Sequence, residues 1–203
     1  LIDSEGGHGG SSKSMFTFVK HLNRENFNLK ILCKKESWIK NEYLKRGINC
    51  RVLTSLPTYT VLDTFLKNFY CLFFFMSFGL INFLLNKKDL KEYIYEFNII
   101  HLNHSNLWFL AIWIKNIFPK KKIKIHIRTL PYKNFFSKLQ YKIILKYTDK
   151  QIFITENEYM HFKELTKRDP SPIIIYNSIE KNKTNRSKYS YLKKSNDFLI
   201  GSF

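Results

Sequence analysis

The chain has 203 residues, of which 44% are hydrophobic and 17% aromatic, and its formal net charge is +18. This composition excludes intrinsic disorder, because so many aromatic side chains form a buried core, and the length predicts one large domain or slightly more. Three widely spaced cysteines exclude a disulfide scaffold and fit a reducing compartment. Only 6 of the 34 basic residues are arginine, the main reader of bases and phosphates, so we expect no nucleic-acid partner.

Short apolar runs alternate with amphipathic stretches along the chain. A polar loop with four glycines follows the first run, and Ser11 or Ser12 is a suitable cap for a helix that includes Met15 and Leu22. Further helices are expected at 36–45, 107–118, 135–147 and 157–165. The expected strands are 1–2, 29–33, 48–53, 97–102, 123–127, 151–154 and 173–176.

Strands that alternate with helices in this way indicate β-α-β units and a mainly parallel sheet. The expected fold class is therefore α/β, with a Rossmann-like sheet covered by helices on both faces. In such sheets, ligands bind beyond the carboxyl ends of the strands. Candidate site residues should therefore follow the strands rather than precede them.

The chain divides into three expected parts. Residues 1–178 would form the Rossmann-like domain. Residues 179–196 are expected to be a linker, because six basic side chains and no acid occur between 181 and 194. The apolar segment 197–203 would be the first strand of a second domain. Since the sequence starts and stops on strand-like segments, we expect a chain truncated at both ends.

Residues 68–86 carry no charge and have a run of three phenylalanines at their centre. As a helix they would be roughly 28 Å long, which is close to the thickness of a bilayer core. Three interpretations are open: a core helix of the domain, an interfacial helix with one face in lipid, and a transmembrane span. The core helix is preferred, because the segment lies inside a regular alternation of strands and helices. Lys67, Lys87 and Lys88 flank it and would suit anionic lipid.

The segment from Gly7 to Ser14 nearly matches the phosphate-binding pattern G-x-x-x-x-G-K-[ST]. It departs at Ser12, where glycine is needed for the backbone to wrap the phosphates, so a P-loop NTPase is a lesser alternative. More generally, a glycine-rich turn that enters a helix presents free N–H groups and the positive end of the helix dipole to a sugar or phosphate. A turn without any ligand is the plain alternative.

Six segments, taken in order, resemble the N-terminal half of a retaining, family-4-type (group 1) glycosyltransferase with two Rossmann-like domains. Residues 4–12 resemble its first glycine loop, and residues 126–128 resemble its H-x-R strand end. The sequence departs from that pattern at Phe97-Asn98, where Pro-Asp is usual, and at Ser178, where glycine is usual. The other similar segments are 97–103, 149–157, 175–179 and 198–203.

This resemblance implies transfer of a hexosyl group from a nucleotide-sugar donor to a lipid-linked or polysaccharide acceptor, with retention, in cell-envelope glycan synthesis. It also implies that the reaction needs no metal ion and no cofactor, and that this half alone is inactive. The enzyme would be cytoplasmic and could bind peripherally to an anionic membrane surface. The implied catalytic residues are Arg128 and His126. The implied substrate-binding residues are Gly7, His8, Gly9, Gly10, Ser11, His101, Asn103, His104 and Glu156.

Several of these residues also have a structural interpretation. His126 alternates with isoleucines and suits a core position, as does His101, whereas His104 would cap the following helix. Glu156 would offset a helix dipole. His101 and His104 have no nearby carboxylate, so a metal site is not expected. The functional alternative of a different class is a non-enzymatic, basic Rossmann-like module that binds membranes or polyanions.

Overall fold

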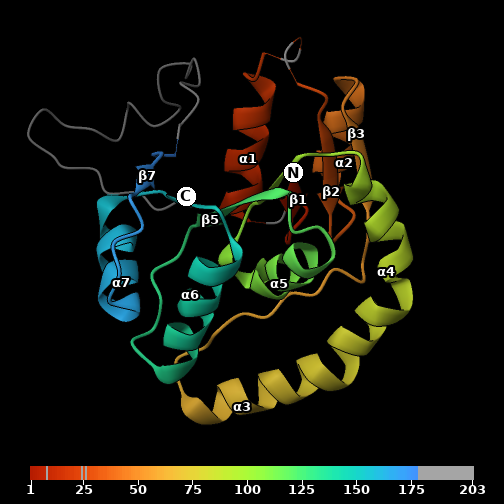
Figure 1. Ribbon diagram of the computed structural model, residues 1–203. Helices are drawn as coiled ribbons and strands as arrows, with labels where there is room; N and C mark the ends of the chain where they lie inside the picture. Colours follow the sequence, from red (N-terminus) through yellow and green to blue (C-terminus); the bar gives the residue numbers. More distant parts are fainter. Residues whose placement is uncertain (8, 24, 26, 178–203) are drawn as a thin grey trace, which may run out of the picture.

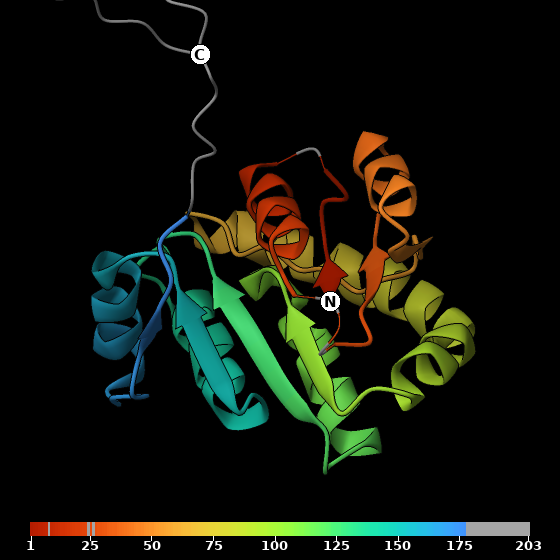
Figure 2. The ribbon, with the colours of Figure 1, turned by 90° about the horizontal axis from the view of Figure 1, so that it is seen from above.

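The computed structural model describes residues 1–7, 9–23, 25 and 27–177, so the expected linker and second-domain strand lie outside the described residues. The strands are β1 (Ile2–Asp3), β2 (Lys30–Cys33), β3 (Asn49–Val52), β4 (Ile99–Leu102), β5 (Lys122–Ile127), β6 (Lys150–Phe153) and β7 (Ile173–Ile174). They form one sheet in the order β3-β2-β1-β4-β5-β6-β7, and every neighbouring pair is parallel. Figure 2 shows these strands side by side, with the order reversing between β1 and β4.

Helices connect the strands and cover both faces of the sheet. The described helices are α1 (Gly10–Lys20), α2 (Trp38–Lys45), α3 (Phe65–Phe74), α4 (Leu80–Tyr95), α5 (Trp108–Ile117), α6 (Phe135–Tyr147) and α7 (Glu156–Thr166). A π-helical turn, η2 (Phe75–Gly79), joins α3 to α4, and a 3-10 turn, η3 (Ser105–Leu107), precedes α5. In Figure 1, α1 lies above the central strands and α5 and α6 lie below them, while α2 shares one core with α1, β2 and β3. The expected α/β fold class is confirmed.

Polar side chains explain where several helices begin. Each of four N-cap residues accepts a hydrogen bond from a backbone N–H of the first turn, which has no partner inside the helix: Ser37, Thr64, Asn134 and Thr155. Gly47, with φ of 67°, follows the end of α2 and permits the left-handed turn into β3. The expected strands, and the helices expected at 36–45, 107–118, 135–147 and 157–165, are confirmed to within two residues at each end.

Two hydrophobic cores lie on opposite faces of the sheet. The smaller core packs Met15 and Val19 of α1 and Tyr43 of α2 against β2 and β3. The larger core includes Leu110 of α5 and Ile144 of α6, packed on the other face. Because both faces are covered around β1, this strand is held firmly between two packed layers.

The apolar segment at 68–86 belongs to one helical stretch, 65–95, and the preferred interpretation of a buried core helix is wrong. Only 17% of its most apolar window is buried, although its length and composition alone would allow a membrane span. Phe83 faces the core, whereas Phe73 and Phe78 are 59% and 67% exposed. The physical reason is that α5 and α6 already cover this side of the sheet, so α3 runs outside them (Figure 1).

Candidate functional site

The ends of three neighbouring strands bring polar residues together where the strand order reverses. Asp3 ends β1, Asn103 follows β4, and Arg128 follows β5. Because these strands are parallel, the three residues lie at one edge of the sheet, beside the loop from β1 to α1. A crevice at this edge is where open α/β sheets bind their ligands.

Asp3 is the buried centre of this group, with an exposed fraction of 0%. Its Oδ2 accepts hydrogen bonds from the backbone N–H of Gly6, at 2.8 Å, and from the hydroxyl of Ser12. Its Oδ1 accepts from Nδ2 of Asn103 at 3.0 Å. These donors offset the cost of burying a carboxylate, and they fix the glycine loop and α1 relative to β4.

Asn103 joins Asp3 to Arg128. Its Nδ2 also donates to the backbone oxygen of Ser11 at 3.1 Å, and its Oδ1 accepts from Nη2 of Arg128 at 2.9 Å and from Nε at 3.2 Å. The backbone oxygen of Asn103 accepts from the same Nε at 3.0 Å. The guanidinium is therefore held in one orientation at the sheet edge.

Arg128 also contacts the end of the described chain. Its Nη1 donates to Oδ1 of Asn177 at 3.0 Å, and this oxygen accepts a second hydrogen bond from the hydroxyl of Ser14 at 2.8 Å. Burial lowers the pKa of Arg128 to about 10, while the carboxylates of Asp3 and Glu5 act in the opposite direction. The side chain thus stays cationic at neutral pH and can attract an anionic group of a ligand.

A cavity of about 280 Å³ lies at the N-terminus of α1, lined by Arg128, His104, Gly10 and Glu5 among others. The helix begins after Gly9, which provides no side-chain cap. Glu5 accepts a hydrogen bond from the hydroxyl of Ser11 at 2.7 Å, close to the positive end of the helix dipole. The cavity therefore combines a carboxylate that can accept from sugar hydroxyls with a guanidinium that can bind an anion.

His104 caps the 3-10 turn η3, as the structural interpretation predicted. Its Nδ1 accepts from the backbone N–H of Asn106 at 3.1 Å. Burial lowers the pKa of His104, so the ring is neutral with its hydrogen on Nε2. His104 also lines a second cavity of about 330 Å³, together with Glu5, Leu62 and Gln140.

His101 and His126 lie next to each other on the sheet, with Nε2 of His101 at 3.2 Å from Nδ1 of His126. Nη2 of Arg128 is also 3.2 Å from that Nδ1, and since a guanidinium only donates, Nδ1 is an acceptor. Burial first, and then the charge of Arg128, lowers the pKa of His126 to about 2. Burial is also the main cause that lowers the pKa of His101 to about 3. Both rings are neutral at neutral pH. Nδ1 of His126 therefore keeps the lone pair that accepts from Nη2 of Arg128, and this contact helps to orient the guanidinium.

Two glycines of the first loop are required by its packing against the segment before α2. Gly6 has φ of 65°, and a Cβ there would overlap the backbone oxygen of Lys35. Gly7 has φ of 103°, and a Cβ there would lie 2.5 Å from Oγ of Ser37. The oxygens of Gly6 and Gly7 accept hydrogen bonds from the hydroxyl of Ser37 and from Nε1 of Trp38. These contacts shape the loop itself, whereas Gly9 and Gly10 lie at the helix end.

The geometry contradicts the P-loop alternative. Helix α1 already begins at Gly10, so the backbone cannot wrap a phosphate through position 12. Ser12 is buried and donates to Asp3, and the side chain of Lys13 is exposed. The loop that remains free to contact a ligand is shorter than the pattern requires.

Of the other expected site residues, Glu156 is exposed in the first turn of α7, where it offsets the helix dipole. His8 lies outside the described residues. Within the described part of the chain, no group of three His, Cys, Asp or Glu residues is placed to hold a metal ion. Sequence reasoning missed Asp3, Glu5 and Asn177. An acidic residue at the end of the first strand, directly before a glycine loop, was the signal available for Asp3.

These features define a doubly wound, Rossmann-like domain with a polar crevice at its switch point. A comparison with known protein families finds no match, and a comparison with curated proteins finds none either. Solved structures that resemble the chain include those of Alr3699/HepE from Anabaena in complex with UDP, with UDP-glucose, and with UDP and glucose. The TM-scores are 0.61, 0.60 and 0.60, at sequence identities of 15%, 14% and 13%.

The likeness to HepE extends over 88% of the present chain and 43% or 44% of the HepE chain. The chain therefore spans less than half the length of these solved structures. At such low identity the comparison establishes the fold, and it agrees with the expectation of a Rossmann-like half of a larger architecture. Nucleotide-sugar binding is a property of the HepE complexes, and its extension to this chain is a proposal.

Proposed function

We propose that the chain is the acceptor-side half of a retaining, group 1 glycosyltransferase that moves a hexosyl group from a nucleotide-sugar. The acceptor would be a lipid-linked or polysaccharide glycan of the cell envelope, and the enzyme would act in the cytoplasm. The observation that carries this proposal is the oriented Arg128 beside the N-terminus of α1, in a fold that HepE uses in complexes with UDP-glucose.

Arg128 would stabilise the leaving group. In sugar transfer from a nucleoside diphosphate, negative charge develops on the diphosphate as the glycosidic bond breaks, and preorganised donors lower that barrier. The guanidinium is held by Asn103 and Asn177 before substrate arrives, so little reorganisation is needed. His126, whose Nδ1 accepts from Nη2, is a positioning residue in this scheme.

Glu5 and His104 would bind the sugar groups. The Glu5 carboxylate accepts hydrogen bonds, and the neutral His104 ring can donate from Nε2, so the pair suits the hydroxyls of a sugar. No metal ion is needed in this scheme, because the cationic side chain and the helix end neutralise the diphosphate. The scheme therefore expects full activity in the presence of EDTA.

The decisive experiment uses the complete protein that contains this chain and follows release of UDP from UDP-glucose with a glycan acceptor. Arg128→Gln should lower kcat by about 100-fold, as for loss of a strong oxyanion donor. The matched control is Arg168→Gln, at an exposed position after α7, which should retain activity. NMR of the anomeric proton of the product would test retention. Equal activity of the Arg128 variant, or no turnover of any nucleotide-sugar by the wild type, would overturn the proposal.

A further inference from the structure

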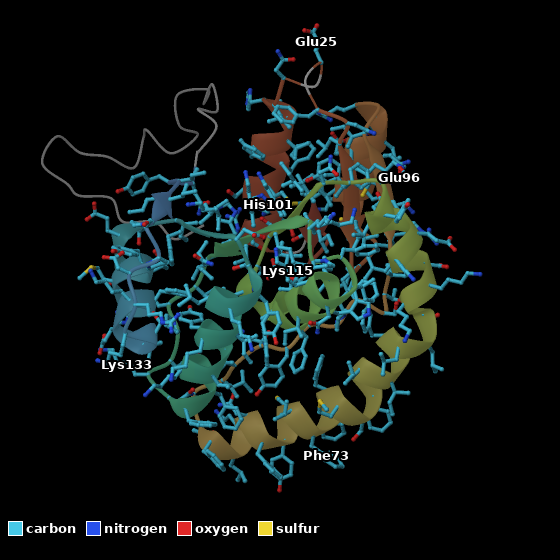
Figure 3. The ribbon with its side chains drawn as sticks, in the orientation of Figure 1. Glu25, Phe73, Glu96, His101, Lys115 and Lys133 are labelled. Carbon is cyan, nitrogen blue, oxygen red and sulfur yellow. The ribbon has the colours of Figure 1, made fainter. Side chains whose placement is uncertain are left out.

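The outer face of the helical stretch 65–95 is an unusual surface. Its exposed side chains are large and apolar, and many are aromatic: Phe65, Leu66, Phe69, Tyr70, Phe73, Phe74, Met76, Phe78, Ile81, Leu84 and Leu85. We call these residues the apolar strip. Figure 3 shows Phe73 on the side of α3 that faces away from the sheet. A continuous exposed strip of this size marks a surface that is covered by something else.

We propose that the apolar strip docks the protein on a bilayer, with α3 and the first turns of α4 lying in the plane of the interface. No charged residue occurs from 68 to 86, so this section can enter the boundary of the acyl chains. Lys87, Lys88 and Lys91 follow it on α4 and are exposed, which places cations at the level of anionic headgroups. The acid between them, Asp89, pairs with Arg51 at 2.8 Å.

The fold excludes a membrane span by this helix. The strands before and after it, β3 and β4, belong to the same sheet, so both ends of the helix lie on one side of any membrane. Its inner face is also occupied, because Phe83 and Leu90 are buried in the core. A bilayer is a better occupant than a second copy of the chain. The stretch bends around the molecule in Figure 1, and two such convex surfaces bury less area against each other than a stable interface needs.

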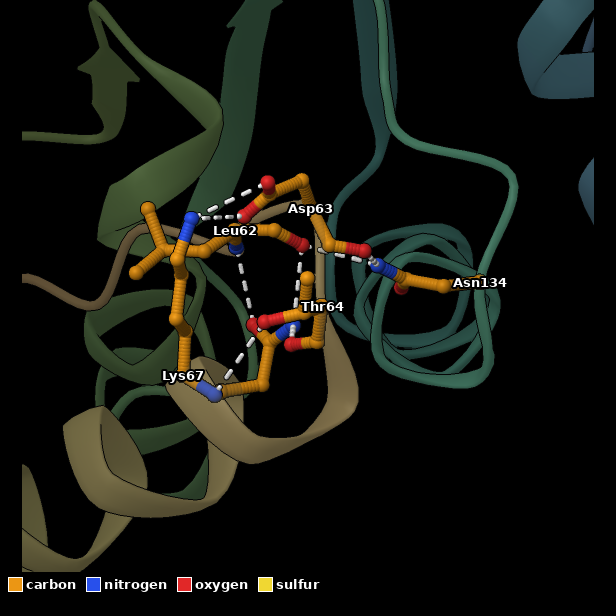
Figure 4. A network of polar contacts seen from close by, with 6 residues as sticks. Leu62, Asp63, Thr64, Lys67 and Asn134 are labelled. Carbon is orange, nitrogen blue, oxygen red and sulfur yellow. Dashed lines mark hydrogen bonds and ion pairs between the residues drawn. The ribbon is translucent and has the colours of Figure 1, made fainter.

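The strip is rigidly connected to the second cavity of the candidate site. Asn68 of α3 is fully buried, and its side chain accepts from the N–H of Leu62 and donates to its oxygen, both at 2.8 Å. Asn134, the N-cap residue of α6, donates to the same oxygen at 2.8 Å (Figure 4). Leu62 lines the 330 Å³ cavity that also contains Glu5 and His104. Docking through α3 therefore holds this cavity near the membrane surface.

This geometry narrows the acceptor class, an inference that rests on the proposed function. An acceptor whose lipid anchor stays in the bilayer can place its sugar between Glu5 and His104, whereas a soluble polysaccharide gains nothing from the docking. The acceptor is therefore an amphiphile with a glycan headgroup. The cavity is bounded on the membrane side by Thr60, Val61 and Leu62, the segment that leads into α3.

Flotation of the 203-residue chain with vesicles tests the docking. The probes are vesicles of phosphatidylcholine alone and of equal parts phosphatidylcholine and phosphatidylglycerol. Phe73→Ser combined with Phe78→Ser should weaken binding by more than about tenfold, since burial of each ring is lost. The control, Leu44→Ser with Met160→Ser, removes two apolar side chains that are similarly exposed on α2 and α7 and should bind as the wild type. Unchanged thermal unfolding of all variants confirms that they fold.

A second set of variants separates the contribution of the lysines from that of the apolar side chains. Lys87→Glu with Lys88→Glu should weaken binding to the phosphatidylglycerol vesicles much more than to phosphatidylcholine alone, while Lys146→Glu with Lys150→Glu should not. Alkaline carbonate should release the bound protein. Failure to float at any lipid concentration, equal binding by the phenylalanine variant, or retention in carbonate would each overturn the docking. The docking would also be overturned if the wild type formed dimers in solution, the phenylalanine variant abolished these dimers, and neither protein bound vesicles.

The acceptor class is tested in the complete protein with UDP-glucose and vesicles of lipid extract from the source cells. The phenylalanine variant should lower glucose transfer into the lipid fraction by about tenfold while slow hydrolysis of UDP-glucose is unchanged. Equal transfer to lipid by the variant would refute the lipid-anchored acceptor. Because flotation uses no nucleotide-sugar, failure to float would leave the proposed transferase activity intact. Conversely, a protein that floats but transfers no sugar would refute only the proposed transferase activity.

Discussion

Replacing Asn103 by alanine removes the side chain that joins Asp3 to Arg128. Four hydrogen bonds of 2.9 to 3.2 Å disappear, one to Asp3, one to the backbone of Ser11 and two to Arg128. Asp3 is fully buried, so its Oδ1 loses the donor that partly compensates its charge. The Asn103→Ala variant should therefore lose stability as well as the orientation of the guanidinium.

The expected loss in the free energy of unfolding is about 3 kcal/mol. A hydrogen bond to a charged group contributes about 1.5–3 kcal/mol, and three of the four lost bonds are of this kind. Arg128 keeps its hydrogen bond to the backbone oxygen of Asn103, and water can enter the space that the side chain leaves. We therefore count the loss as two hydrogen bonds of about 1.5 kcal/mol each. For a chain of this size the change corresponds to roughly 10 °C in Tm.

Urea denaturation followed by circular dichroism measures this loss. The control is Asn98→Ala, at an exposed position before β4, which should change the free energy of unfolding by less than about 0.5 kcal/mol. A loss below about 1 kcal/mol for Asn103→Ala would refute the reasoning, because it would mean that the buried network contributes no more than one neutral hydrogen bond.

Two further predictions concern the loop and the histidines. Gly6→Ala should lose at least about 2 kcal/mol, because φ is 65° and a Cβ meets a backbone oxygen. Gly10→Ala, with nothing within 4 Å, should be neutral or gain up to about 1 kcal/mol in the same urea titration. For His126, the folded pKa lies near 2, far below its ordinary value, so lowering the pH protonates the unfolded chain first and destabilises the fold. From pH 7 to pH 5 the wild type should lose about 2 kcal/mol more than His126→Asn, and parallel profiles would contradict this.

The strands and helices of the sheet could be predicted because the sequence pattern of each one lies within a short segment of the chain. Short apolar runs bounded by polar residues, such as Ile31 to Cys33, encode strands buried on both faces, and their alternation with helices encodes a parallel sheet. The residues that follow the strands, including Asn103 and Arg128, could be expected at the ligand edge for the same reason. Their mutual geometry could not, because it depends on pairing strands far apart in sequence.

Asp3 was missed, and the burial of the apolar strip was mispredicted, for a related reason. The position of Asp3 before a glycine loop was a local signal, but its bond to Asn103, which is 100 positions away, is not encoded in any local pattern. The strip has the composition of a buried helix, and composition does not tell which layer a helix occupies. Its exposure follows from α5 and α6 having already covered the sheet, which is a property of the complete fold.

The π-helical turn Phe75–Gly79 is a point at which the chain can change its length. This turn accommodates one residue more than a regular α-helix would, so deleting one residue there would restore regular α-helix and leave the buried face of α4 almost unchanged. Leu90 and Ile94 would stay in the core, whereas a deletion in the regular helix between 80 and 89 would rotate both by about 100°. Relatives of this protein should therefore tolerate the loss of one residue within the turn, but not in the helix that follows it.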